Sequence, residues 1–180
     1  MKKLITLLFL AIGLVSFGQT AANPDVVCIN ATGEQYFVTN TPTSTYQWTI
    51  TGGGGVLQTG QGTSLITVDW GATAGLYPNA VTVVETTASG CVGNPITLDV
   101  MILELILQPV SSFCLSDPAF TLSANMGGGT FSGNGIVGND FDPSVAGVGT
   151  HVITYSFNGC TTTTNITVNS LPATGPIQHY

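Results

Sequence analysis

Basic residues are almost absent from this chain. Lys2 and Lys3 are its whole complement of Lys and Arg, whereas its nine Asp and Glu all lie at or beyond Asp25. Without cationic side chains the usual clamps for phosphate cannot form, which argues against nucleic acid, nucleotides and anionic lipid as partners. We interpret the acidic excess as a source of solubility.

Good helix formers are also scarce, and beyond the N-terminus no window shows apolar residues at a 3.6-residue period. Period-two alternation recurs instead, as in residues 82–85 and 152–155, among many Thr, Ser, Asn and Gly. We therefore predict an all-β fold. The expected strands cover residues 35–39, 46–51, 65–70, 80–86, 96–106, 119–124, 129–132, 151–157 and 162–168.

The apolar run near the N-terminus, residues 4–15, is shorter than the roughly 20 residues that a membrane-spanning helix needs. It follows two lysines and ends in small residues before Gln19, the pattern of a secretory signal peptide. We predict cleavage after residue 18, so that the protein is secreted or held at the cell surface without a membrane span.

Cysteine is limited to four residues, which in an exported chain predict two disulfides with three possible pairings. We favour Cys28 with Cys91 and Cys114 with Cys160, because each pair brackets one block of strands. The blocks meet at Gln108-Pro109, where a strand would end. This predicts two β-sandwich modules, residues 19–107 and 108–169, and a short tail, residues 170–180.

An unusually apolar segment covers residues 96–107 and is too long for an ordinary strand. One interpretation is a last strand of the first module that continues into a linker packed on the second. The other is an exposed edge to which another protein adds a strand. The candidate contact residues for the second interpretation are Leu98, Val100, Ile102, Leu103 and Leu105.

Two groups of motifs resemble known extracellular modules. Residues 46–53, 60–64 and 66–71 resemble the PKD-like modules of secreted Bacteroidetes proteins, and residues 128–135, 141–144, 146–150, 153–155 and 159–160 resemble their companion immunoglobulin-like repeats. The resemblance implies two tandem immunoglobulin-like sandwiches that act as non-catalytic spacer or adhesion modules. Such modules occur in surface adhesins connected with gliding motility and type IX secretion. The expected partner is a surface or secretion-system protein, or a second copy of the chain.

Groups that carry out catalysis or bind metal are sparse. His151 alternates in phase with apolar residues of its strand, which indicates a packed position, and His179 lies in the tail, so neither predicts a catalytic triad. Asp140 and Asp142 would share one face of a strand, but Asp142-Pro143 also starts turns, so they are only a weak calcium candidate. We predict no cofactor, no metal and no enzymatic activity.

Aromatic residues leave one alternative function open. Trp48, between two cysteines, is expected in the core as in immunoglobulin-like sandwiches. Trp70, Tyr77 and Tyr46 would provide a sugar-stacking platform if they were exposed on one face, which would indicate a carbohydrate-binding module. A further alternative is a self-assembling filament subunit, in which the apolar strand or the tail inserts into a neighbouring copy.

Overall fold

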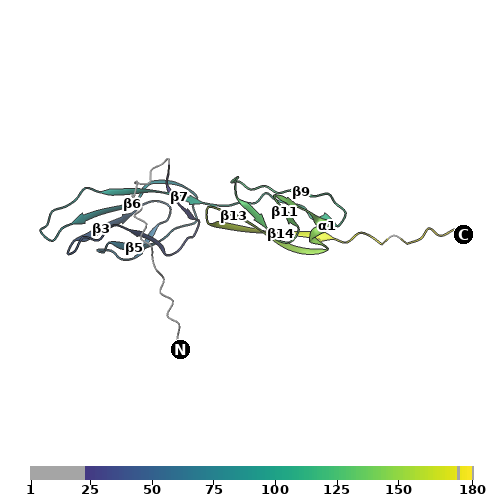
Figure 1. The fold of residues 1–180 in the computed structure, drawn as a ribbon, viewed down its shortest axis with the longest axis horizontal. Coiled ribbons are helices and arrows are strands. Elements are labelled where there is room, and N and C mark those ends of the chain that lie inside the picture. Colours follow the sequence, from purple (N-terminus) through teal and green to yellow (C-terminus); the bar gives the residue numbers. More distant parts are fainter. Residues whose placement is uncertain (1–22, 174, 180) are drawn as a thin grey trace, which may run out of the picture.

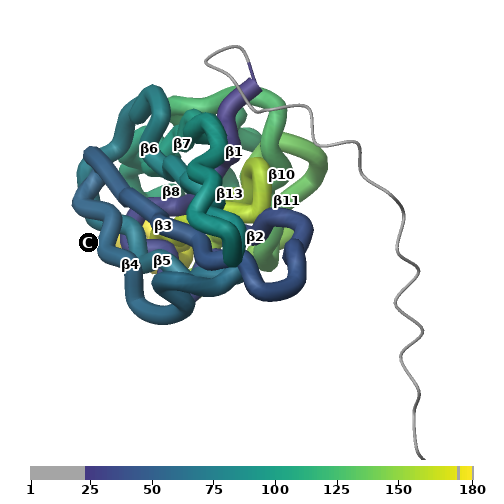
Figure 2. Tube along the Cα trace, turned by 90° about the vertical axis from the view of Figure 1, so that its left-hand side faces the viewer, coloured from purple at the N-terminus to yellow at the C-terminus, as the bar shows by residue number. Residues whose placement is uncertain are grey.

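The computed structural model describes residues 23–173 and 175–179, so the predicted signal peptide lies outside the described residues. These residues form almost only β-structure, which confirms the all-β prediction. Strands β1 to β7 form a first lobe, and strands β8 to β14 with the short helix α1 form a second lobe. The lobes lie end to end (Figure 1), and viewed along the long axis the second lies behind the first (Figure 2).

The first lobe contains two sheets. One has the strand order β1-β7-β6-β3 and the other the order β2-β5-β4. Strand β1 is parallel to β7, whereas the other pairs are antiparallel. The strands are β1 (Asp25–Cys28), β2 (Glu34–Phe37), β3 (Thr45–Ile50), β4 (Val56–Thr59), β5 (Leu65–Asp69), β6 (Gly75–Thr86) and β7 (Ile96–Leu103).

The second lobe also contains two sheets, with the orders β10-β13-β14-β8 and β11-β12-β9. Its long hairpin joins β13 to β14 through Asn158 and Gly159, both at positive φ, as a two-residue hairpin turn requires. The elements are β8 (Phe113–Cys114), β9 (Phe120–Thr121), β10 (Thr130–Ser132), β11 (Ile136–Val137), β12 (Asp140–Phe141), α1 (Pro143–Ala146), β13 (Gly149–Phe157) and β14 (Cys160–Asn169).

Strand β6 begins earlier than the sequence predicts. The predicted strand covers residues 80–86, but β6 starts at Gly75, and Pro78-Asn79 lies in a bulge inside it, where the register with β7 shifts between Tyr77 and Val81. The carboxylate of Asp99 on β7 accepts a hydrogen bond from the Asn79 backbone N–H at 2.7 Å. This hydrogen bond gives a partner both to the buried Asp99 carboxylate and to the Asn79 N–H, which the bulge leaves without a partner in the strand pairing. Strand β6 can therefore continue through the bulge.

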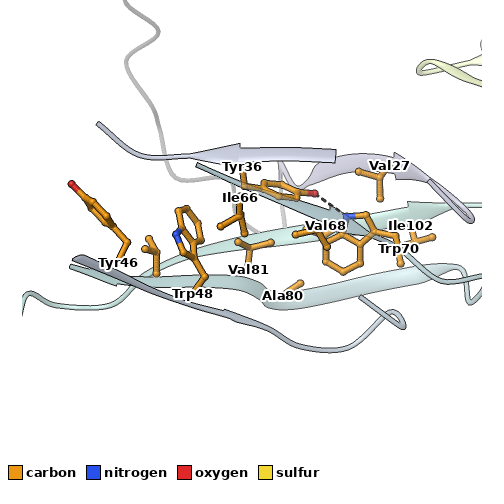
Figure 3. Packing of buried hydrophobic residues seen from close by; sticks show 12 residues of the cluster. Val27, Tyr36, Tyr46, Trp48, Ile66, Val68, Trp70, Ala80, Val81 and Ile102 are labelled. Carbon is orange, nitrogen blue, oxygen red and sulfur yellow. Dashed lines mark hydrogen bonds between the residues drawn. The ribbon is translucent and has the colours of Figure 1, made fainter. Parts of the chain in front are cut away.

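Each lobe has its own buried cluster. In the first, alternate residues of β3 and β5 point inward, including Tyr46, Trp48, Ile66 and Val68 (Figure 3). Trp48 is buried as predicted, and its indole N–H donates to the Thr63 carbonyl at 2.8 Å. The second cluster contains Phe131, Phe141, Ile153, Tyr155, Ile166 and Val168, together with Leu103 and Leu105 from the connection between the lobes.

The disulfide pairing that we favoured from the sequence is wrong. Cys28 is bonded to Cys160, with 5.5 Å between the two Cα atoms, whereas Cys91 and Cys114 are free and exposed. The parallel pairing of β1 with β7 places Cys28 beside Leu103, at the end of the first lobe that meets the second. The bond therefore joins the lobes to each other instead of closing each sandwich.

The apolar segment is the connection between the lobes and not a free edge. Strand β7 lies between β1 and β6; β1 pairs with Val100–Leu103, and β6 pairs with Ile96–Leu98 and Val100–Ile102. Leu98 is half-buried in the first lobe, and Val100, Ile102, Leu103 and Leu105 are buried. The interpretation as a surface for strand addition is therefore wrong for Val100, Ile102, Leu103 and Leu105, because the two cores already bury these side chains.

Asn125 fastens this connection to the second lobe. Its side-chain carbonyl accepts from the Ile106 N–H at 2.8 Å, and its amide donates to the Glu104 carbonyl at 2.8 Å. Its own N–H donates to the Ile106 carbonyl at 2.9 Å. With the disulfide, these bonds hold the connecting chain at two separate places on the second lobe.

Candidate functional site

The three rings predicted to stack on sugars do not form a platform. Tyr46 is 2% exposed and Trp70 is 3% exposed, and Tyr77 is half-buried over the glycine turn at Gly52 and Gly53. The Trp70 indole donates to the Tyr36 hydroxyl at 3.0 Å inside the core (Figure 3). The glycan-stacking hypothesis is wrong for Tyr46 and Trp70, because both rings are buried; Trp70 continues the inward phase of Ile66 and Val68.

Asp140 and Asp142 have structural partners instead of a shared cation. Asp140 accepts from the Thr121 hydroxyl at 2.6 Å, and Asp142 caps α1 by accepting from the N–H of Ser144 at 2.9 Å and of Val145 at 3.4 Å. The Ser144 hydroxyl also donates to Asp142, and these bonds lower the pKa of the Asp142 carboxyl. Across the described residues no group of three or more His, Cys, Asp or Glu has a metal-binding arrangement.

The two histidines occupy different settings. His151 is half-buried on β13, in phase with the buried Ile153 and Tyr155, and its Nε2 lies 2.8 Å from the Gly147 carbonyl oxygen. Its Nδ1 lies 3.3 Å from the Asn134 amide nitrogen, and its ring packs near Phe141. His179 is exposed in the tail. Both positions agree with the sequence interpretation of His151 as a packed residue and His179 as part of the tail.

A groove opens at the end of the first lobe that is remote from the second lobe. We call this end the tip. The groove has a volume of about 340 Å³. Its lining comes from both sheets and from the turn before β7, and it consists of Val38, Tyr46, Val83, Glu85, Gly93, Asn94 and Ile96. Ile96 is 63% exposed, so an apolar side chain at the groove has no cover from this chain.

Glu85 is the charged residue of the groove. It lies directly opposite Tyr46 in the pairing of β3 with β6. Hydrogen bonds from the side chains of Ser44, Thr41 and Tyr46 lower the pKa of its carboxyl, so the carboxylate is ionised at neutral pH. The groove thus combines apolar walls with one anionic group that is held by neutral donors.

Beside the groove is a smaller hollow of about 210 Å³, which includes the thiol-bearing residue Cys91. Cys91 lies in a tight turn between β6 and β7, where its N–H donates to the Thr87 hydroxyl oxygen at 3.1 Å and its carbonyl accepts from the Thr87 N–H at 3.0 Å. The Ser89 hydroxyl donates to the Cys91 sulfur at 3.7 Å. The neighbouring Val92 is 70% exposed, so the tip continues the apolar surface of the groove.

The sequence interpretation missed this tip because we assigned Cys91 to a disulfide. Its local sequence, Gly90-Cys91-Val92-Gly93, carries a signal in retrospect, since a cysteine and a valine flanked by glycines are presented on a turn. Within the described ranges, no helix has the length and apolar character to cross a membrane.

Comparisons with known proteins agree with the fold. A family described as a PKD-like domain matches residues 16–100. None of the curated proteins matches the sequence. Among solved structures, a chimeric titin Z1Z2 functionalised with an exogenous KLER peptide from decorin has a TM-score of 0.31 and 11% identity over 83% of this chain and 93% of its own. Extracellular domains 3–5 of Drosophila OTK have a TM-score of 0.26 and 13% identity over 88% of this chain and 69% of their own.

Residues 16–100 are thus similar to a PKD-like domain, which supports the PKD-like part of the resemblance found in the sequence. Both structural likenesses are too distant to compare residues or the placement of lobes. PKD-like domains are generally non-catalytic and of an extracellular type, which fits a binding or structural module.

Proposed function

We propose that this protein is exported and serves as a non-catalytic structural and binding module of a cell-surface assembly. More specifically, we propose that it is a component of an adhesin, or an accessory of a gliding-motility or type IX secretion complex. Its partner would be a protein of that assembly. The match to a PKD-like domain supports the role as a non-catalytic structural and binding module. The motif resemblance to secreted Bacteroidetes modules suggests the role in an adhesin or in a motility or secretion complex.

The observation that carries the proposal is the double attachment between the lobes. Cys28–Cys160 links them covalently, and the chain passes directly from Ile102 in the first core to Leu103 and Leu105 in the second. A flexible linker between independent modules would need neither feature. Two sandwiches fixed end to end provide a spacer of defined length, which suits a protein that positions a contact surface away from its anchor.

The groove at the tip is the contact surface that we assign to this role. It lies at the free end of the first lobe, while the C-terminal tail leaves the far end of the second (Figure 1). Apolar walls with a single carboxylate suit a protein surface better than a polyanion, since the chain has no Lys or Arg beyond residue 3.

Surface location is the first thing to test. Source cells would be treated with proteinase K, because trypsin has no Lys or Arg to cleave beyond residue 3, and separately with a membrane-impermeant reductant followed by a membrane-impermeant maleimide, which labels the exposed residues Cys91 and Cys114. We expect labelling and digestion on intact cells. Protection of the protein until the cells are lysed would contradict the proposal.

Partner retention is the second test. The protein would be cross-linked in the envelope and recovered, and its companions identified by mass spectrometry, for the wild type, for Ile96→Ser at the groove, and for Val137→Ser as a control. Val137 is 59% exposed on the second lobe, close to the 63% of Ile96. We expect cross-linked companion proteins, further copies of this chain included, to be lost with Ile96→Ser alone. Recovery of polysaccharide without protein would refute the assignment.

A further inference from the structure

The two unpaired cysteines lie at opposite ends of the molecule. Cys91 is in the turn at the tip, and from there β7 runs from Ile96 to Leu103, beside Cys28 at the junction of the lobes. Strand β14 starts at the junction with Cys160 and ends at Asn169, which is paired with Cys114. Cys114 therefore lies where the tail leaves the second lobe, an end that we call the base.

The two free thiols cannot meet within one chain. At about 3.3 Å per residue, β7 spans roughly 23 Å and β14 roughly 30 Å, and the lobes lie end to end, so the tip and base are roughly 50 Å apart. A disulfide needs Cα atoms within about 7 Å of each other. Any disulfide of Cys91 or Cys114 must therefore be made with another molecule.

Exposed apolar side chains lie near both cysteines. At the tip, Cys91 lines a hollow beside the apolar groove. At the base, Cys114 is exposed on a short strand, held by hydrogen bonds with Asp117 at 2.7 and 3.0 Å. Val148 and Leu171 flank the same end of the β13–β14 hairpin and are 56% and 50% exposed. The base thus offers exposed apolar side chains that could pack on the exposed Ile96 of the groove at the tip.

We propose that copies of this chain assemble tip to base, with Cys91 of one copy bonded to Cys114 of the next. This names the partner of the groove described above and rests on the proposed export to an oxidising compartment. A contact between two different surfaces of the same molecule does not close on itself unless the rotation happens to form a ring, so repetition yields a linear fibre. The existing Cys28–Cys160 bond would keep each subunit stiff within that fibre.

The bond forms by thiol–disulfide exchange with an oxidised dithiol carrier of the exporting compartment. One thiolate attacks the carrier disulfide and forms a mixed disulfide, which the second thiolate then resolves. The sulfur–sulfur bond of the carrier breaks and that between Cys91 and Cys114 forms. Two electrons pass to the carrier, and two protons end on its thiols, so the exchange needs no metal.

Charge sets the conditions under which the copies meet. Glu85 lies at the tip and Asp117 at the base, and the chain offers no Lys or Arg beyond residue 3 to offset them. Like charges at both ends repel, and salt screens this repulsion over a Debye length of about 10 Å at 0.1 M. We therefore expect cross-linking to accelerate as ionic strength rises.

The experiment uses purified full-length protein with Cys28–Cys160 intact, incubated with oxidised glutathione and separated on non-reducing gels. We expect a ladder of dimers, trimers and longer species that reducing agent dissolves. Pepsin fragments should contain Cys91 joined to Cys114. Ile96→Ser should slow ladder formation about fivefold, because part of an isoleucine is no longer buried on docking, while Val137→Ser leaves the rate unchanged.

Single cysteine variants test the direction of the contact. Cys91→Ser alone and Cys114→Ser alone should form no ladder, whereas their mixture should give the dimer that joins the remaining Cys91 to the remaining Cys114. A control with Cys91→Ser and Thr73→Cys moves the thiol to an exposed residue before β6, near the junction. If that control forms the same ladder, or if Cys91–Cys91 and Cys114–Cys114 dimers form as readily as the mixed one, the proposal is overturned.

A wild type that remains monomeric also overturns it. These measurements on purified protein are independent of cell location. Absence of the ladder together with surface digestion of the protein would remove the tip-to-base assembly alone. A ladder in vitro together with protection from proteinase K on intact cells would remove the proposed function.

Discussion

Removal of Cys28–Cys160 by the double substitution Cys28→Ala and Cys160→Ala is the perturbation most closely tied to the fold. The two residues are 132 positions apart, so their bond closes most of the described chain into one loop. On the chain-entropy model a loop of this length contributes about 5 kcal/mol to the free energy of unfolding at 25 °C. We expect a loss of about that size in guanidinium chloride, measured against the wild type.

Two optical probes can separate the lobes in this assay. Trp48 and Trp70, the two tryptophans of the chain, both lie in the first core, so tryptophan fluorescence follows that lobe, whereas far-ultraviolet circular dichroism follows both. In the wild type the covalent link and shared apolar connection should make the two transitions coincide. In the double variant they should separate, because the loss of the bond lets one lobe unfold ahead of the other.

The matched control is Cys91→Ser with Cys114→Ser, which changes the same number of cysteines at exposed, unpaired positions. Its free energy of unfolding should stay within about 0.5 kcal/mol of the wild type under conditions that prevent cross-linking. If the bonds joined Cys28 to Cys91 and Cys114 to Cys160, each double variant would break both bonds. Equal losses in the two variants would therefore refute the observed pairing and the role of the junction.

Three further predictions concern the first lobe. Tyr36→Phe removes the hydroxyl that accepts from the buried Trp70 indole N–H, and it should lower the free energy of unfolding by about 1–3 kcal/mol in chemical denaturation. The control Tyr77→Phe loses an exposed hydroxyl and should lower it by under about 0.5 kcal/mol. Gly60→Ala should lower the free energy of unfolding by about 1–3 kcal/mol more than Gly62→Ala, because both have φ near +90° but only the first Cβ would meet a backbone carbonyl. Glu85 has a lowered pKa in the folded protein, so its contribution to the free energy of unfolding is present above its unfolded pKa and is lost as the pH falls through its folded pKa. The free energy of unfolding should therefore fall less steeply with decreasing pH in Glu85→Gln than in the wild type. An equal slope would contradict the hydrogen bonds assigned to Glu85.

The strands that could be predicted from the sequence are those with a local signal. Strands β3, β5, β13 and β14 show alternation over five or more residues, and Asn158-Gly159 is a strong hairpin signal, so the predicted ranges overlap the observed ones. Strands β1 and β4 and the two-residue strands β8, β11 and β12 were missed. They are too short for alternation to stand out, and β1 and β8 also pair with strands that are distant in the sequence.

Alternation carried more information about the candidate site than we used. Ile66, Val68 and Trp70 fall on one phase, as do Tyr46 and Trp48, and the inward phase of the valine and isoleucine indicates that the rings are buried. The position of Trp70 at the strand end led to the opposite hypothesis. A residue just beyond a strand keeps the phase of that strand when the chain stays extended, and here the Trp70 N–H is held by the Ala31 carbonyl at 2.8 Å.

The disulfide could not be predicted, for a reason that lies in strand direction. We favoured pairs of cysteines that lie at the two ends of one strand block, on the assumption that the ends of a block meet in space. That assumption holds only when the two cysteines lie on neighbouring strands of the same sandwich. Here β1 pairs in parallel with β7, so Cys28 lies beside Leu103, the end of β7 that points to the second lobe, and Cys91 precedes the opposite end of the same strand. A single parallel pairing therefore moves Cys28 to the junction and leaves Cys91 at the tip. The same argument places Cys114 at the base, because β8 pairs in parallel with the far end of β14. The two parallel pairs thus determine both the bond inside the molecule and the two thiols left for a bond between molecules.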